Sequence, residues 1–291
     1  MMVLQERDIA ALLICARCFI VSASQIRRVC YPDDTTGRVT RRRLTKMVHE
    51  GVLFRRRLAV VNPTDGAATP VYHLTKTGRE FLASHFDDPQ FLHLPIEPSQ
   101  PQHLQHYVAV AETRLLLDAA VSQHADVKLH RWCHEDAILN PEEPDATKRR
   151  RLFTELSTSP KLVCVPDAAF VLEFQGQRAV CYLEQDRDTF FHDRVAARKS
   201  PGYSGLFQQQ LHKQHFPETT LDHFFVVVIT PTAKRRDQLQ TAFTAKNKGT
   251  PAERIYRFGS FDELTPENFL FEPMFRCCHH DDRVPLVKRS G

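Results

Sequence analysis

Glycine is scarce in this chain, and long apolar runs are missing. Only 10 of the 291 residues are glycine, and the apolar run Phe224–Ile229 is far shorter than the roughly 20 residues that a membrane-spanning helix needs. The N-terminal residues include Glu6 and Asp8 and contain no uninterrupted apolar segment of the kind that forms a secretion signal. These absences argue against fibrous, membrane and secreted proteins, so we expect a soluble protein of the cytoplasm.

Common catalytic loops and metal spacings are absent as well. The sequence has no Walker-type or dinucleotide-binding glycine loop and no Gly-x-Ser-x-Gly motif. Its eight cysteines lie in apolar periodic segments or near the C-terminus, which favours reduced thiols over a disulfide framework. Cys15 and Cys18 fall inside a predicted helix without a second pair at zinc spacing, so we interpret them as core packing. The segment Cys277–Asp282 contains good ligand types, but adjacent residues rarely converge on one ion, and incidental composition is favoured.

Positive charge is concentrated in one short segment. Between Arg38 and Arg57 the chain has eight basic residues and a single acid, Glu50, so this segment carries a formal charge of +7. Because the whole chain carries +4, the remaining residues carry −3. A basic patch on an otherwise mildly acidic protein is typical of a surface that binds a polyanion such as DNA, and an ordinary solvated face is the alternative.

Three helices are predicted before residue 51. Apolar residues recur at helical spacing between Ile9 and Ala16, and Ser22 with Gln25 forms a capping-box pattern that opens a second helix. A third helix is predicted from about 37 to 50, ending at Gly51. It has an apolar inner stripe and an outer stripe of long cationic side chains, which can span the major groove of DNA and its flanking phosphates.

A hairpin and a fourth helix follow. Strands are predicted at 52–61 and 71–74, joined by a turn at 62–66, and a helix is predicted from Lys76 to His85. Three helices plus a basic hairpin form a winged helix-turn-helix, and the stretch Tyr72–Gly78 resembles the junction between wing and helix in many bacterial regulators. A winged helix used only for protein contacts is the alternative, but it would leave the arginines unexplained. The candidate DNA-binding residues are Arg38, Arg41, Arg42, Arg43, Lys46, Arg55, Arg56 and Arg57.

Prolines mark a boundary after this domain. Four prolines between 86 and 102 predict a linker at 87–102, which separates a domain at 1–86 from a second domain at 103–291. In the second domain we expect a helix to about 123, strands at 127–132, 162–174 and 178–184, a helical region at 189–215 interrupted at 201–202, a strand at 224–229 and a helix at 232–246. This order predicts an α/β domain whose sheet is covered by helices. A basic run at 148–151 is as consistent with a surface loop as with a DNA contact.

Three carboxylates are predicted to meet at one end of that sheet. If the turn between the second and third strands is centred on Gly176, Asp167 faces Gln185, and Glu184 and Asp186 share one face of their strand. Carboxylates this close repel one another, and they stay ionised together only where a nearby cation offsets their charge. Oxygen ligands suit Mg²⁺ or Mn²⁺, so Asp167 and Glu184 are the candidate metal ligands.

The same residues resemble a known nuclease pattern, the PD-(D/E)XK core. A Pro-Asp pair precedes one strand, Glu-Gln-Asp ends the next, a glutamate lies on the helix before and a lysine on the helix after. This resemblance implies a restriction-endonuclease-like fold for residues 103–291. The matching residues in chain order are Glu112, Pro166, Asp167, Glu184, Gln185, Asp186 and Lys199.

With the preceding winged helix, residues 5 to 230 resemble the replication-relaxation family of plasmid and mobile-element proteins, which is similar to mobilisation relaxases. The resemblance implies a role in the replication or mobilisation of a plasmid or other mobile element. It also implies double-stranded DNA and plasmid replication or mobilisation proteins as partners, and association with the nucleoid or a plasmid. A homodimer is compatible with a winged helix, but no heptad pattern decides it.

One position departs from the nuclease pattern, because Asp186 stands where lysine is expected. Either Lys199 or Arg187 supplies the missing cation, or the site does not cut. In the first function, a Mg²⁺- or Mn²⁺-dependent endonuclease nicks DNA, with Asp167 and Glu184 on the metal and Lys199 assisting. Glu112 and Asp186 complete the set of candidate catalytic residues. In the second, the acids and bases form a stabilising ion-pair network in a non-catalytic DNA-binding accessory factor or regulator.

Overall fold

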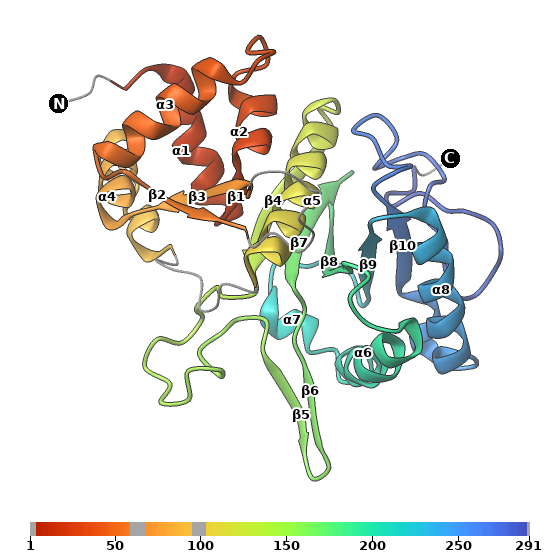
Figure 1. The fold of residues 1–291 in the computed structure, drawn as a ribbon. Coiled ribbons are helices and arrows are strands. Elements are labelled where there is room, and N and C mark those ends of the chain that lie inside the picture. Colours follow the sequence, from red (N-terminus) through yellow and green to blue (C-terminus); the bar gives the residue numbers. More distant parts are fainter. Residues whose placement is uncertain (1–3, 59–67, 95–102, 290–291) are drawn as a thin grey trace. The chain divides into compact units, whose positions relative to one another are not determined.

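The computed structural model describes residues 4–58, 68–94 and 103–289, which form two compact units (Figure 1). Unit 1 comprises residues 1–114 and unit 2 residues 115–291, so the division falls inside helix α5 (Leu104–Ser122). The mixed α/β class is confirmed. Of the predicted linker at 87–102, residues 95–102 lie outside the described residues. Among the helices of the described ranges, none combines the length and apolar character needed to cross a bilayer.

Unit 1 packs helices against a small antiparallel sheet. Its helices include α1 (Glu6–Cys18), α2 (Ala23–Cys30), α3 (Arg38–His49) and α4 (Lys76–Phe86), and the 3-10 helix η2 (Pro89–His93) follows α4. The sheet order is β1 (Val21–Ser22), β3 (Pro70–Leu74), β2 (Leu53–Arg57). The four helices predicted here are therefore confirmed, and the predicted hairpin is present as β2 and β3. Its turn, predicted at 62–66, lies outside the described residues.

Local chemistry explains where two of these helices begin. At the start of α2 the hydroxyl of Ser22 accepts the backbone N–H of Gln25 at 3.2 Å, and the Gln25 side chain accepts the backbone N–H of Ser22 at 2.8 Å, which confirms the capping box. At the start of α4 the hydroxyl of Thr75 accepts the backbone N–H of Gly78 at 3.0 Å. A Cβ atom at Gly78 would lie 2.1 Å from the carbonyl oxygen of Val52, so only glycine lets α4 approach the hairpin this closely.

The thiols behave as small apolar side chains. All eight cysteines are buried and free of disulfide bonds. Cys15 and Cys18 are each 2% exposed on the inner face of α1, which confirms their interpretation as core packing.

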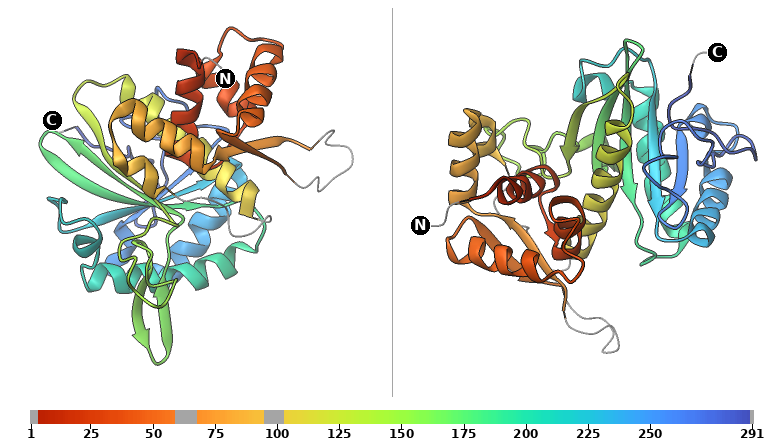
Figure 2. Two further views of the ribbon diagram at one scale, coloured as in Figure 1. Left: turned by 90° about the vertical axis from the view of Figure 1, so that its left-hand side faces the viewer. Right: turned by 90° about the horizontal axis from the view of Figure 1, so that it is seen from above.

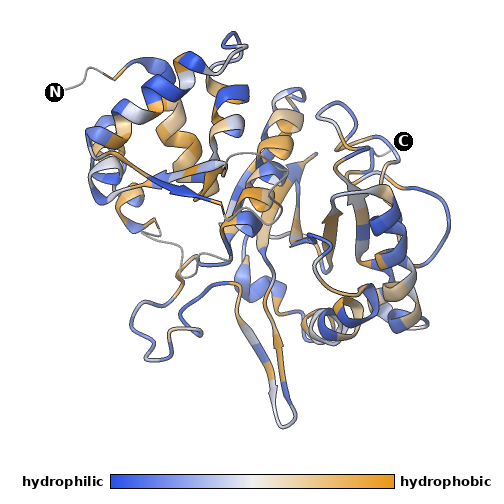
Figure 3. Ribbon diagram, viewed as in Figure 1, coloured by the Kyte–Doolittle hydropathy of each residue, from blue (hydrophilic) through white to orange (hydrophobic). Residues whose placement is uncertain are grey.

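Unit 2 is built on a five-stranded sheet with the order β10 (Tyr256–Ser260), β9 (Phe224–Thr230), β8 (Gln177–Gln185), β7 (Ala168–Phe174), β4 (Val127–His134). Strands β8, β9 and β10 run parallel, whereas β7 is antiparallel to both of its neighbours. Helices α6 (His192–Gln208) and α8 (Ala233–Asn247) cover one face of the sheet (Figures 1 and 2), where Tyr182 and Val226 pack with Tyr203 and Phe243. Strand β9 is apolar over almost its whole length (Figure 3).

Two predicted elements of unit 2 need correction, and three elements were not predicted. The strand predicted at 162–174 is two strands: β6 (Lys161–Cys164) pairs with β5 (Thr154–Thr158) in a hairpin that extends away from the central sheet (Figure 2), and β7 begins only at Ala168. Pro166 lies between them, and its lack of a backbone N–H breaks the ladder. The helical region divides into α6 and the short α7 (His212–His215), and Pro201 lies inside α6 without interrupting it. Strands β5 and β10 and the 3-10 helix η4 (Pro251–Arg254) were not predicted.

The pairing of β7 with β8 also differs from the prediction by one residue. Ala168 pairs with Leu183, so Asp167 comes level with Glu184 and not with Gln185. The connecting loop has only two residues, at 175 and 176, and their φ values are 49° and 76°. Two-residue loops with positive φ at both positions match the twist of a hairpin, and they set its register.

Candidate functional site

Glu184 lies near the carboxyl end of β8 and meets two side chains of α6. Lys199 Nζ is 2.8 Å from Glu184 Oε1 and 2.7 Å from Oε2, and the Tyr203 hydroxyl donates to Oε1 at 2.5 Å. Lys199 also donates to the carbonyl oxygen of Val165 at 3.0 Å. Residues 199 and 203 are one helical turn apart, so both reach the same carboxylate. Glu184 itself is only 8% exposed, which makes this ion pair nearly buried.

Asp167 joins this pair from the segment just before β7. Its backbone N–H donates a hydrogen bond to the carbonyl oxygen of Leu183 at 3.1 Å, and its carboxylate accepts one from the backbone N–H of Gln185 at 2.7 Å. The charge of Asp167 acts on both Glu184 and Lys199. The structure therefore brings together Asp167, Glu184 and Lys199 from two strand ends and a helix. The sequence left open whether Lys199 or Arg187 supplies the cation that the nuclease pattern expects. In the structure Lys199 contacts Glu184. Arg187 is half-buried.

Glu135 is a further carboxylate near this cluster, and the sequence patterns did not single it out. It follows β4 directly, and one of its carboxylate oxygens lies within 4.8 Å of a carboxylate oxygen of Asp167. Because β4 and β7 are antiparallel neighbours, the residue after β4 and the residue before β7 meet at the same edge of the sheet. The strand predicted at 127–132 ends three residues before Glu135, so an acidic residue close to the end of a predicted strand was the signal that could have found it.

Burial and charge shift the acid–base properties of the pair in a consistent way. Burial raises the pKa of Glu184 to about 7, and the neighbouring Lys199 offsets this only in part. Burial alone would lower the pKa of Lys199, but the carboxylates of Glu184 and Asp167 outweigh it and raise that pKa. The lysine is therefore a protonated cation near neutral pH, while Glu184 changes its charge there.

Asp186, although only two residues from Glu184, is engaged elsewhere. The guanidinium of Arg235 on α8 donates to both of its carboxylate oxygens, at 2.8 Å from Nε and 3.0 Å from Nη2. Arg235 also pairs with Asp188 at 3.0 Å, and its side chain is 4% exposed. This bidentate, nearly buried pair ties the end of β8 to α8, so the geometry of Asp186 points to a structural role.

Glu112, the remaining candidate acid, belongs to unit 1. Its carboxylate accepts hydrogen bonds from Arg28 at 2.6 Å and from Gln25 at 3.0 Å, both on α2. Gln25 also donates to the carbonyl oxygen of Val108 at 2.9 Å. These contacts fasten the first part of α5 to α2.

The predicted two-sided character of α3 is present. Thr40, Leu44 and Met47 are buried, and the opposite side of the helix is cationic and open to solvent. On the hairpin, Arg56 lies over the ring of Phe54, with 5.6 Å between the guanidinium carbon and the ring centroid. The exposed basic residues of these two elements are Arg38, Arg41, Arg42, Lys46, Arg55 and Arg57, and we call this set the basic face.

Arg43 differs from the rest of the predicted DNA-binding set. Its guanidinium forms an ion pair with Asp8 of α1, including an Nε–Oδ1 hydrogen bond of 2.9 Å, and its side chain is 14% exposed. Tyr31 donates to the same carboxylate at 2.8 Å. Burial alone would raise the pKa of Asp8, but the hydrogen bonds from Arg43, the Gln5 backbone and Tyr31 outweigh it and lower that pKa. This contact joins α1 to α3 in the interior of unit 1.

The ligand types around Asp167 fit a hard divalent cation. Asp167, Glu184 and Glu135 offer carboxylate oxygens, which Mg²⁺ and Mn²⁺ prefer. Lys199 already shares both oxygens of Glu184, so an ion bound here would share that carboxylate with the ammonium group. Asp167 and Glu184 are the predicted ligands that would hold the ion. One carboxylate oxygen of Glu135 lies within 4.8 Å of one of Asp167, but among the described residues the group of ligand atoms at that spacing does not include Glu184.

Fold and sequence together identify a two-unit α/β protein, and a comparison with family models identifies its family. Residues 13–219 match the replication-relaxation family, so the chain belongs to that family and the resemblance is confirmed. The match covers unit 1 from within α1 and unit 2 through α7, including Asp167, Glu184 and Lys199. Searches of curated proteins and of solved structures found no match to this chain.

Proposed function

We propose that this chain is a DNA-binding protein that acts in the replication or mobilisation of a plasmid or other mobile element, and that unit 2 carries a metal-dependent DNA-nicking centre. Membership of the replication-relaxation family supports the first part. The contact between Lys199 and Glu184, next to Asp167, carries the second part, because it supplies the cation that position 186 lacks.

In this proposal unit 1 is a winged helix that binds double-stranded DNA through the basic face. The long side chains of Arg38, Arg41, Arg42 and Lys46 reach the major groove and its phosphates, while the hairpin arginines contact the backbone. Arg43 is not part of that surface, since its guanidinium holds Asp8. The exposed cations make DNA binding strongly dependent on salt concentration.

The nicking centre uses two carboxylates and one lysine. Asp167 and Glu184 would hold a Mg²⁺ or Mn²⁺ ion, which when bound would supply activation of water and stabilisation of the charge of a phosphoryl transition state. Lys199 keeps its proton and places a positive charge beside the scissile phosphate, where the position of the charge matters more than the chain segment that supplies it. Asp186 holds α8 through Arg235, and Glu112 holds α5 to α2.

A non-catalytic factor is the second candidate function, and a specific observation favours it. Both oxygens of Glu184 are already bonded, by Lys199 and Tyr203, as in an ion pair that only stabilises the fold. In that case unit 2 would hold DNA or a partner protein without cutting.

Incubation of supercoiled plasmid with the protein and Mg²⁺ or Mn²⁺ separates the two functions. We expect nicking by the natural sequence and a loss of about 100-fold or more in both Asp167→Asn and Lys199→Met, as for removal of one transition-state-stabilising group. The matched control removes the exposed surface pair of Lys213 and Asp222, whose charged atoms lie 2.5 Å apart, by Lys213→Met and Asp222→Asn. Thermal unfolding of each variant shows that it is folded.

The outcomes are distinct. Nicking that survives in Asp167→Asn would eliminate this site as the centre. A folded protein that binds DNA but nicks it with neither metal would favour the non-catalytic factor. Loss of nicking in the control pair as well would mean that the assay responds to general surface charge.

A further inference from the structure

The C-terminal segment contains a second cluster of ligand-type residues, outside the family match at 13–219 and independent of the proposed nicking centre. Phe275 and Val284 pair through two backbone hydrogen bonds of 3.0 and 2.8 Å, which close a loop between them. Arg276 pairs in the same way with Phe258 of β10, at 2.8 and 3.0 Å. Cys277 thus enters the loop from a backbone that is fixed to the central sheet.

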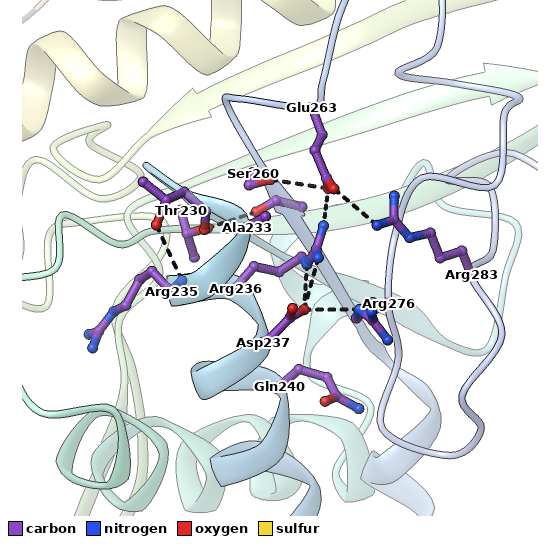
Figure 4. A network of polar contacts seen from close by, with 12 residues as sticks. Thr230, Ala233, Arg235, Arg236, Asp237, Gln240, Ser260, Glu263, Arg276 and Arg283 are labelled. Carbon is purple, nitrogen blue, oxygen red and sulfur yellow. Dashed lines mark hydrogen bonds and ion pairs between the residues drawn. The ribbon is translucent and has the colours of Figure 1, made fainter.

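Side chains of α8 anchor the same point. Gln240 donates to the carbonyl oxygen of Cys277 at 3.0 Å, and Asp237 pairs with Arg276 at 2.9 Å (Figure 4). Arg236, 2% exposed, pairs with Asp237 and with Glu263, and Glu263 pairs with Arg283 on the other side of the loop at 3.0 Å (Figure 4). The backbone that carries Cys277 is therefore held on both sides before any ligand binds.

Within this loop, a thiol and two imidazoles converge. One ligand atom each from Cys277, His279 and His280 lie within 4.8 Å of one another. The Cys277 sulfur is 3.5 Å from Nδ1 and also 3.5 Å from Nε2 of His280, and the rings of His279 and His280 meet edge to face with centroids 4.2 Å apart. Two ligands that bind zinc at about 2.3 Å through sulfur and about 2.0 Å through nitrogen, at a tetrahedral angle, are themselves about 3.5 Å apart. The equal distances place the sulfur between the two ring nitrogens, so the His280 ring must turn to aim one nitrogen at a shared ion.

We propose that Cys277, His279 and His280 bind a Zn²⁺ ion. One Cys and two His supply the borderline-soft donors that Zn²⁺ prefers, unlike the oxygen donors around Asp167. The Cys277 thiol loses its proton to solvent when the Zn–S bond forms, so one proton is released per ion bound. The fourth position is taken by water or by Asp282, whose charge acts on Cys277.

The obvious rival is a metal-free thiol that donates a hydrogen bond. Its sulfur lies 3.5 Å from the His280 ring nitrogens, 3.6 Å from the carbonyl oxygen of His280 and 3.9 Å from that of Asp282. The two explanations differ in two respects. A hydrogen bond keeps the thiol proton and needs nothing from His279, whereas an ion uses the His279 ring and requires the thiolate.

Zinc binding is measured on the full, untagged chain after treatment with a chelator and addition of Zn²⁺ alone. We expect about one tightly bound ion per chain, and an affinity more than about 100-fold weaker in Cys277→Ser and His280→Gln, since removal of a direct ligand costs more affinity than removal of a residue that only orients a ligand. His279→Gln should weaken binding in the same direction. The matched controls are Cys278→Ala, next in sequence but packed in the core, and His49→Gln, exposed on unit 1.

Substitution by Co²⁺ provides a readout that needs no variant. A tetrahedral site with a thiolate gives a sulfur-to-cobalt charge-transfer band in the near ultraviolet and strong visible absorption. Octahedral, weakly coloured Co²⁺, or Zn²⁺ binding that Cys277→Ser leaves unchanged, would overturn the proposal. Zinc lost in Asp167→Asn but kept in Cys277→Ser would show that the ion sits among the carboxylates instead, which overturns it too.

Discussion

Lys199 follows Glu184 by fifteen residues, yet its ammonium nitrogen lies 2.7 Å from the Glu184 carboxylate. Helix α6 covers one face of the sheet and brings Lys199 back to the carboxyl end of β8, which creates this contact. It places a permanent cation beside a carboxylate that titrates near neutrality. The affinity of this site for a metal ion should therefore depend on pH.

Metal affinity at the carboxylate cluster should rise with pH. Burial raises the pKa of Glu184 to about 7, and only the ionised form binds a cation, so Mn²⁺ should bind about tenfold more tightly at pH 8 than at pH 6. Calorimetric titration with Mn²⁺ at the two pH values measures this. In Glu184→Gln the pH dependence should disappear along with most of the binding. An equal affinity at pH 6 and pH 8 in the natural sequence would contradict a role for Glu184 on the metal.

DNA binding should depend on the exposed arginines of α3. Replacement of Arg41 and Arg42 by alanine should weaken binding to duplex DNA and reduce the slope of log K against log salt by about 0.9 for each phosphate that is no longer neutralised. Fluorescence anisotropy at several salt concentrations gives both quantities. The control removes two exposed charges from other helices of unit 1, by Arg17→Ala and Lys76→Ala. If both double variants lose affinity equally, the basic face has no special role.

The buried pair of Asp8 and Arg43 should support the stability of unit 1. Asp8→Asn leaves a largely buried guanidinium without its anion, and we expect the free energy of unfolding to fall by about 3 kcal/mol. Chemical denaturation measures this loss. Asp33→Asn, which removes the exposed partner of Arg7, should cost less than about 1 kcal/mol. Similar losses in both variants would refute an internal role for Asp8.

The same carboxylate should contribute to acid denaturation. Because the folded state lowers the pKa of Asp8, its contribution is fully present above the unfolded-state value of about 3.9 and is lost as pH falls toward the folded-state value. The natural sequence should therefore lose stability more steeply than Asp8→Asn below pH 4. Parallel pH–stability curves for the two proteins would be inconsistent with a lowered pKa.

Asp186 should matter for folding and not for nicking chemistry. Asp186→Asn weakens a bidentate pair with Arg235, which is 4% exposed, so we expect a loss of about 3 kcal/mol in unfolding free energy. Nicking by the fraction that remains folded should stay within a few-fold of the natural level. Asp222→Asn, in a solvated pair with Lys213, is the control and should change stability by less than about 1 kcal/mol. Abolished nicking in stable, folded Asp186→Asn would return this residue to the catalytic set.

Much of unit 1 could be predicted from short-range patterns. The capping residues Ser22 and Gln25, the apolar inner stripe of α3 and the strands of the basic hairpin all depend on neighbours a few residues away. Patterns of this range are visible in the chain because helix and strand periods repeat within one or two turns. The same patterns found four of the five strands of the central sheet of unit 2, but they missed β10 and joined β6 to β7 across Pro166.

The residues of the acidic cluster and the candidate cation Lys199 were visible in the sequence, but the partner of Asp186 was not. Asp167, Glu184 and Lys199 were recognised as a set, and no local pattern could say that Asp186 would instead meet Arg235, forty-nine residues later. The proximity of Glu135 to Asp167 and of Cys277 to His280 likewise depends on the tertiary structure, although the residue types themselves are visible in the sequence. Residue type and local period are properties of a short segment, whereas the partner of a charged side chain depends on strand register and on how helices cross the sheet. Those are decided only when distant segments pack together.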